Sequence, residues 1–146
     1  MLKIALGTDH AGFQLKEVIK KYLLSEGHEV KDFGTTTPDA VDYPDFVIPA
    51  AESVAKGECD YGVVFGGSGN GEAIAANKVK GIRCGVCWNI DSAQLTKHHN
   101  NANVIALGGR MVTEELGIAI VKTWLETTFE GDRHERRLEK IRKYEG

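Results

Sequence analysis

The chain has 146 residues, 42% of them hydrophobic, and a formal net charge of −3. This length suits one domain that buries its own core, and we expect a single domain over residues 1–146 because no linker divides the sequence. A slightly acidic chain lacks the basic field that nucleic-acid binding needs, and no apolar run is long enough for a membrane helix or a signal peptide. We therefore expect a soluble cytoplasmic protein without nucleic-acid or membrane partners.

Apolar strands alternate with amphipathic helices along the whole chain. The first half predicts strands at 3–7, 29–33 and 61–65, a helix that ends at Gly27, a helix at 45–56 and a helical run at 73–78. The second half predicts strands at 82–88 and 103–107, a helix at 91–99, a helix capped by Thr113 and a last helix at about 132–144. Asp132 and Glu135 have the spacing of a capping box for that last helix.

Five short apolar strands separated by helices are typical of a parallel sheet covered on both faces. We predict an α/β fold with a three-layer α/β/α architecture, a doubly wound (Rossmann-like) five-stranded parallel sheet, and leave the strand order open. Ligands of such sheets bind beyond the carboxyl ends of the strands. The segments Asp9-His10, 66–72 and Gly108-Gly109-Arg110 each follow a strand, so we expect them to meet at that edge.

A glycine-rich loop, Gly66-Gly67-Ser68-Gly69-Asn70-Gly71-Glu72, joins the strand at 61–65 to the next helix. Its unobstructed N–H groups and the helix N-terminus suit a phosphate or an oxyanion. The charge of Glu72 would repel a bound phosphate, so its presence beside Ser68 favours acid–base chemistry at a developing negative charge. The alternative is a tight turn with Glu72 as a favourable first-turn charge. A dinucleotide fingerprint does not fit, because Glu72 stands where its third glycine is needed, and the chain has no GxxxxGK(S/T) motif for a nucleoside triphosphate.

His99 differs from these groups because it ends a helix and precedes a strand, which places it at the opposite edge of the sheet. If His99 is catalytic, it has to reach the site from a second subunit. Its alternative role is that of a helix C-terminal histidine, which the helix dipole favours.

Arg133 and Arg137 are four residues apart on one helical face and could grip a phosphate together. The alternative to phosphate binding is that both arginines lie on a solvent-exposed face of the helix and form ion pairs with Glu135 and Glu139.

Asp9 and His10 also have a structural alternative. Aspartate caps helices well, so this pair would then be a helix cap followed by a surface histidine.

The three cysteines, Cys59, Cys84 and Cys87, are an odd number, which fits a reducing compartment. Cys84 and Cys87 have CxxC spacing, but they fall within the predicted strand 82–88 rather than at a helix start. Residues three apart on a strand face opposite sides. We therefore predict two core cysteines, not a redox or zinc site.

Seven motifs in order resemble the ribose-5-phosphate isomerase B family, which also includes galactose-6-phosphate and allose-6-phosphate isomerases. The motifs are Gly7-Thr8-Asp9-His10-Ala11-Gly12-Phe13, Asp42-Tyr43-Pro44, Gly66-Gly67-Ser68-Gly69-Asn70-Gly71, Ala75-Ala76-Asn77-Lys78, His99-Asn100-Asn101-Ala102-Asn103, Gly108-Gly109-Arg110 and Gly131-Asp132-Arg133-His134-Glu135-Arg136-Arg137. Many members carry a catalytic cysteine at the position of Gly66. This chain is similar to the branch that lacks it and has a glutamate at the position of Glu72.

The resemblance implies an aldose–ketose isomerase that interconverts ribose 5-phosphate and ribulose 5-phosphate without a metal or redox cofactor. It also implies a homodimer with shared active sites, and we expect the last helix at the dimer interface; whether dimers pair into tetramers is left open. The alternatives are an isomerase of a four- or six-carbon aldose phosphate and a non-catalytic sugar-phosphate binding module.

The resemblance also implies roles for individual residues. Glu72 moves a proton between C2 and C1, Ser68 assists proton movement between O1 and O2, and His99 and Asp9 assist ring opening. Arg133 and Arg137 hold the phosphate, with His10 and Arg110 nearby, and the loop N–H groups stabilise the enediolate. The implied substrate-binding residues are His10, Gly67, Gly69, Asn70, Gly71, Asn100, Arg110, Arg133 and Arg137.

Overall fold

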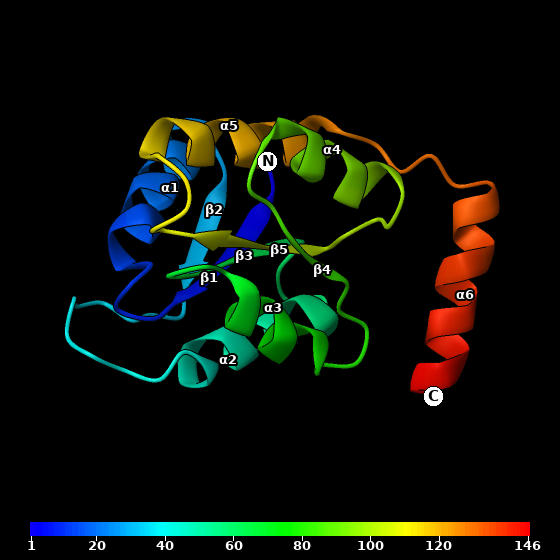
Figure 1. The fold of residues 1–146 in the computed structure, drawn as a ribbon, viewed down its shortest axis with the longest axis horizontal. Helices are drawn as coiled ribbons and strands as arrows, with labels where there is room; N and C mark the ends of the chain where they lie inside the picture. Colours follow the sequence, from blue (N-terminus) through cyan, green and yellow to red (C-terminus); the bar gives the residue numbers. More distant parts are fainter.

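The computed structural model describes residues 1–146 and contains one five-stranded parallel sheet (Figure 1). The strands are β1 (Lys3–Thr8), β2 (Glu29–Asp32), β3 (Tyr61–Gly66), β4 (Cys84–Val86) and β5 (Val104–Gly108). Their order across the sheet is β2-β1-β3-β5-β4, which the sequence left open. The predicted fold class is confirmed.

Six helices accompany the sheet. They are α1 (Phe13–Ser25), α2 (Pro44–Ala55), α3 (Asn70–Asn77), α4 (Ile90–His98), α5 (Glu114–Glu126) and α6 (Arg133–Glu145). Figure 1 shows α1, α4 and α5 on one face of the sheet, α2 and α3 on the other, and α6 apart, beyond β4. None of these helices is long and apolar enough to cross a membrane.

The path of the chain explains which helices share a face. The chain leaves β1 for β2 and then turns back across the sheet to β3, so the right-handed crossovers put α1 and α2 on opposite faces. Each face buries its own apolar cluster, one that includes Leu15 and Trp124 and one that includes Val47 and Ala76. The order reverses between β1 and β3, and this is the point where doubly wound sheets bind ligands.

Cys87 belongs to the first cluster, and the half-buried Cys84 packs against the second, on the opposite face of the sheet, as the strand spacing predicts. Both thiols are free, and burial raises the pKa of Cys87 to about 12 and that of Cys84 further. Thiols with so little thiolate at neutral pH are poor nucleophiles and poor metal ligands. The structure therefore gives no support to a redox role for this pair.

Of the two helix N-caps predicted from the sequence, one is confirmed and one is wrong. Thr113 caps α5 as predicted, since its hydroxyl oxygen accepts a hydrogen bond from the Leu116 N–H at 3.1 Å. The capping box predicted for α6 is wrong: Asp132 has a positive φ of 57° and its side chain makes no capping hydrogen bond. The Glu135 carboxylate instead accepts a hydrogen bond from Arg142 within the helix.

Candidate active site

A cleft of about 390 Å³ lies beyond the carboxyl ends of β1, β3 and β5. It is lined by Asp9, Tyr43, Gly67, Ser68, Gly71, Glu72, Arg110 and Met111. Strand pairing brings these segments together, because Thr8 pairs with Phe65 and Gly66 pairs with Gly108. The predicted meeting of the three polar segments at one edge of the sheet is thus observed.

A second hollow, of about 350 Å³, lies between α6 and the β4 edge. Its main polar side chains are already engaged: the Asn77 amide bonds the backbone of Cys84, and the Arg83 guanidinium donates to the carbonyls of Asn100 and Asn101. The first cleft is the better candidate for chemistry because it brings together two carboxyl groups, Asp9 and Glu72, and the guanidinium group of Arg110.

The glycine loop bends sharply between β3 and α3. Gly69 has a φ of +87°, in the left-handed region that favours glycine, and it precedes the first residue of α3. The Ser68 hydroxyl oxygen accepts a hydrogen bond from the Asn70 N–H at 3.2 Å. The turn therefore places the N-terminus of α3, with its positive dipole end, at the cleft.

The Glu72 carboxyl group lies in the space where a side chain of residue 66 would be. A Cβ built on Gly66 would overlap the carboxyl carbon and both oxygens of Glu72. Although it lines the cleft, Glu72 is only 4% exposed. The Glu72 carboxyl group can therefore lie here only because residue 66 is a glycine.

The surroundings of Glu72 favour its protonated form. Burial raises the pKa of Glu72 above its ordinary 4.5, the negative charge of Asp9 adds to the rise, and the backbone amides of Glu72 and Gly69 act against it. A carboxylate with a raised pKa is a stronger base, better matched to taking a proton near neutral pH. The alternative of a first-turn charge also fits its position in α3, but it does not explain the burial.

Asp9 holds the turn that follows β1. Its Oδ1 accepts hydrogen bonds from the N–H groups of Ala11 at 2.9 Å and Gly12 at 3.1 Å. The N-cap residue of α1 is Gly12, so Asp9 supports the turn before the helix while it lines the cleft.

Of two further predicted binding residues, Arg110 lines the cleft and His10 does not. His10 Nδ1 accepts a hydrogen bond from the Val41 N–H at 3.2 Å, which ties the turn after β1 to the loop before α2. The Arg110 side chain lines the cleft beside Gly67, and its backbone N–H donates to the Gly67 carbonyl at 3.0 Å.

Seven predicted residues do not line this cleft: His10, Gly69, Asn70, His99, Asn100, Arg133 and Arg137. His99 is the C-cap residue of α4, and its ring stacks on that of His134 with centroids 4.3 Å apart. Within one chain, His99 thus lies outside the cleft that holds Glu72.

The alternative pairing of the arginines with Glu135 and Glu139 is not observed. Both carboxylates pair with Arg142, while Arg133 pairs with Glu130 at 3.3 Å. Glu130 was not among the predicted site residues.

Two cleft residues, Tyr43 and Met111, were not predicted as site residues. Tyr43 belongs to the Asp42-Tyr43-Pro44 motif that carries the family resemblance, so a signal for it was present. Met111 follows Gly108-Gly109-Arg110 and carries no chemical signal of its own.

Substitution Gly66→Ala should displace the Glu72 carboxyl group toward solvent. The pKa of Glu72 should then fall toward its ordinary value, because the carboxylate regains water. Carbon-13 NMR titration of the glutamate carboxyl signals measures this change. Gly67→Ala is the matched control, since a Cβ there would lie 3.1 Å from the Arg110 side chain and would leave Glu72 in place. An unchanged Glu72 pKa in Gly66→Ala would contradict the steric argument.

Substitution Asp9→Asn should also lower the pKa of Glu72, because it removes the nearby negative charge that disfavours ionisation. The amide oxygen can still accept from the Ala11 and Gly12 N–H groups, so the turn should survive. The same NMR titration checks the prediction, and a Glu72 pKa that stays the same or rises would refute it.

Comparison with known proteins places this geometry in a family. The ribose/galactose isomerase family model matches residues 4–141. Ribose-5-phosphate isomerase B of Escherichia coli is 48% identical over 141 residues, which cover 97% of this chain and 95% of that protein.

Solved structures agree with the sequence comparison. The ribose-5-phosphate isomerase B of Clostridium thermocellum superposes with a TM-score of 0.97 at 49% identity, covering 99% of this chain and 97% of that one. The enzyme of Mycoplasma genitalium, solved with bound ribulose 5-phosphate, has a TM-score of 0.95 at 41% identity and covers 98% of this chain and 95% of its own. The chain belongs to the ribose/galactose isomerase family.

Proposed function

We propose that this protein interconverts ribose 5-phosphate and ribulose 5-phosphate, a step of the pentose phosphate pathway, by ring opening and proton transfer through an enediolate. The observation that carries the proposal is the buried Glu72 carboxyl group, held in the glycine loop at the N-terminus of α3. The names of the relatives and the ribulose 5-phosphate bound to the Mycoplasma genitalium enzyme support the choice of sugar.

Glu72 is the base that takes the proton from C2 of the open-chain sugar and returns it to C1. Its raised pKa suits this role, because a stronger base lowers the barrier to removing a proton from carbon. As the proton leaves C2, negative charge develops on the sugar oxygens. The N–H groups of Gly67, Gly69, Asn70 and Gly71 stabilise that charge, and Ser68 assists proton movement between O1 and O2.

Ring opening precedes this step and needs a proton taken from the anomeric hydroxyl and one returned to the ring oxygen. We assign this task to Asp9, which lines the cleft, and to His99 of a second subunit. His99 lies outside the cleft of its own chain, which supports a site shared across a homodimer. The odd number of cysteines supports a cytoplasmic location.

The dimer interface that we propose includes α6. This helix lies at the edge of its own chain, beyond β4 (Figure 1); it buries His134 and Leu138 but exposes two large apolar side chains, Ile141 at 52% and Tyr144 at 96%. A second copy that covers them would also bring Arg133 and Arg137 to the neighbouring cleft. There the two arginines hold the phosphate, with His10, Arg110 and Asn100 contacting the rest of the substrate.

Substitution Glu72→Gln tests the proposed base. We expect kcat for ribose 5-phosphate to fall by about 10²–10⁴-fold, the usual contribution of general acid–base catalysis, with little change in substrate binding. The pKa of Glu72 is raised in the folded state, so its stabilising contribution exists below its ordinary pKa and is lost as the pH rises through the raised value. At neutral pH the neutral glutamine should therefore leave the protein at least as stable, and the thermal midpoint controls for unfolding.

Near-normal turnover in Glu72→Gln would exclude Glu72 as the base.

The wild-type enzyme should have its highest kcat/KM for ribose 5-phosphate among four-, five- and six-carbon aldose phosphates. A higher kcat/KM for another sugar would make that sugar the substrate instead of ribose 5-phosphate. A non-catalytic binding module would incorporate no solvent deuterium into any of these sugars.

Mixing His99→Ala and Glu72→Gln proteins tests the shared site. If each site takes Glu72 from one chain and His99 from the other, a hybrid dimer has one intact site, and an equal mixture should recover about a quarter of wild-type activity. Steady-state assays after subunit exchange, verified by native mass spectrometry, measure the recovery. No recovery after verified exchange would assign both residues to sites within one chain.

A further inference from the structure

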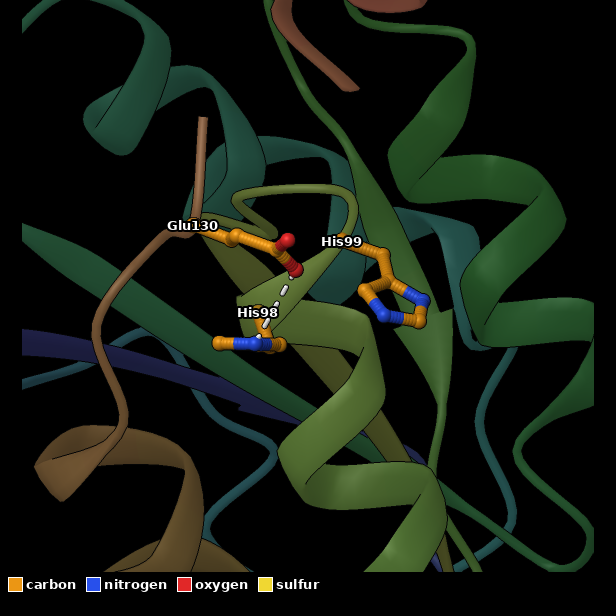
Figure 2. Close-up of side chains that lie close together, drawn as sticks. All are labelled: His98, His99 and Glu130. Carbon is orange, nitrogen blue, oxygen red and sulfur yellow. Dashed lines mark ion pairs between the residues drawn. The ribbon is translucent and has the colours of Figure 1, made fainter. Parts of the chain in front are cut away.

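A cluster of nitrogen and oxygen donors lies outside the cleft, where the end of α4 meets the loop before α6. It consists of His98, His99 and Glu130 (Figure 2), with one donor atom from each residue within 4.8 Å of the others. The Glu130 N–H donates to the His98 carbonyl at 2.9 Å, so the two backbone segments that carry the cluster are fixed to each other. We refer to these three residues as the α4 cluster.

The hydrogen bonds of His98 determine which nitrogen is free. Its Nδ1 lies 3.1 Å from the Thr128 carbonyl oxygen, and a carbonyl can only accept, so Nδ1 carries a proton and donates it. In the neutral ring Nε2 then presents a lone pair, and it faces Oε2 of Glu130 at 3.1 Å. A histidine whose Nδ1–H is held by a backbone carbonyl is oriented as metal-ligating histidines usually are.

The two oxygens of Glu130 have different partners. Oε1 lies 3.3 Å from the Arg133 guanidinium, while Oε2 faces the histidines. Nε2 of His134 lies 3.5 Å from the same Oε2, and the His134 side chain is 7% exposed. That nitrogen is buried and makes no hydrogen bond.

Two imidazole nitrogens therefore face the same carboxylate oxygen of Glu130. A lone pair on a ring nitrogen is repelled by the carboxylate oxygen, so each nitrogen that faces Oε2 needs a proton or a metal ion between the two atoms. A proton on one ring satisfies only one of these contacts, whereas a metal ion satisfies several at once. The unpartnered Nε2 of His134 is the independent sign that the cluster is incomplete as it stands.

We propose that the α4 cluster binds one divalent transition-metal ion of the zinc class. Two imidazoles and one carboxylate are a set that Zn²⁺ accepts, with a fourth position for water or for His134. Tetrahedral zinc ligands lie about 3.3 Å apart, so the 3.1 Å pair is already at that spacing, and the other donors, within 4.8 Å, need a small side-chain movement. The His99 ring is half-buried at a helix end, and its movement would shift its stacking on the His134 ring.

Calorimetric titration of the tag-free protein with zinc chloride tests the proposal without any substrate. We expect saturation at one ion per chain, with affinity reduced at least about tenfold in both Glu130→Gln and His98→Gln. The Glu130→Gln change keeps the size of the side chain but removes the anionic donor. His28→Asn is the matched control: His28 accepts a hydrogen bond from the Leu2 N–H far from the cluster, and asparagine keeps an acceptor there.

Cobalt(II) serves as an optical probe of the ligands. Visible bands of a tetrahedral nitrogen and oxygen site, lost in Glu130→Gln, support the proposal. A cobalt–thiolate band would place the ion on cysteines and overturn it. Failure to saturate with zinc, or unchanged affinity in both variants, would show that His98 and Glu130 form only a protonated ion pair.

One consequence rests on the proposed function. A metal ion on His99 would remove that imidazole from ring opening, so zinc should inhibit ribose 5-phosphate isomerisation, and a chelator should reverse the inhibition. Glu130→Gln should retain turnover and resist zinc. If zinc binds the cluster without inhibiting the reaction, His99 is excluded as a ligand. If the protein has no isomerase activity at all, the proposed function is refuted, and the calorimetric result still decides whether the metal site exists.

Discussion

The arrangement of the cleft depends on one steric constraint: residue 66 and the carboxyl group of Glu72 occupy the same volume. Since glycine has no side chain, the end of β3 lets Glu72 fold back against it and become almost fully buried. The burial then raises the pKa of the carboxyl group. Steric fit, burial and proton affinity are thus consequences of one missing Cβ, and a side chain at position 66 would remove all three together.

The sheet topology determines which groups join Glu72. β1, β3 and β5 are neighbours, so the turns after them supply Asp9, the glycine loop and Arg110 to one cleft. α4 instead joins β4 to β5, and its last turn ends at the amino edge of the sheet. A residue there, such as His99, cannot line the same cleft of its own chain. The separation is a property of parallel βαβ connections, independent of any detail of side-chain placement.

Much of this arrangement could be read from the sequence because it follows from short-range rules. The alternation of apolar strands and helices predicts the parallel sheet, and the CxxC spacing within a strand predicts that Cys84 and Cys87 face opposite clusters. The strand order could not be read, because apolar strands of similar length do not specify their neighbours. The capping box predicted at Asp132 was wrong for a similar reason. The positive φ of Asp132 comes from the path of the chain before α6, and the spacing of a local motif does not encode that path. Glu130 carries no local signal either, since it lies between helices and its partners His98 and His134 come from both sides of it in the chain.

Glu72 and Glu130 show how surroundings give the same side chain different chemistry. For Glu72, burial and the charge of Asp9 raise the pKa. For Glu130, desolvation acts upward as well, but the positive charge and the hydrogen bond of Arg133 outweigh it, and the pKa is lowered. Carboxyl groups whose pKa values are pushed apart take different roles: the one with the raised pKa exchanges protons, and the one with the lowered pKa remains an anion that attracts cations. The proton transfer proposed for Glu72 and the metal binding proposed for Glu130 are therefore compatible at the same pH.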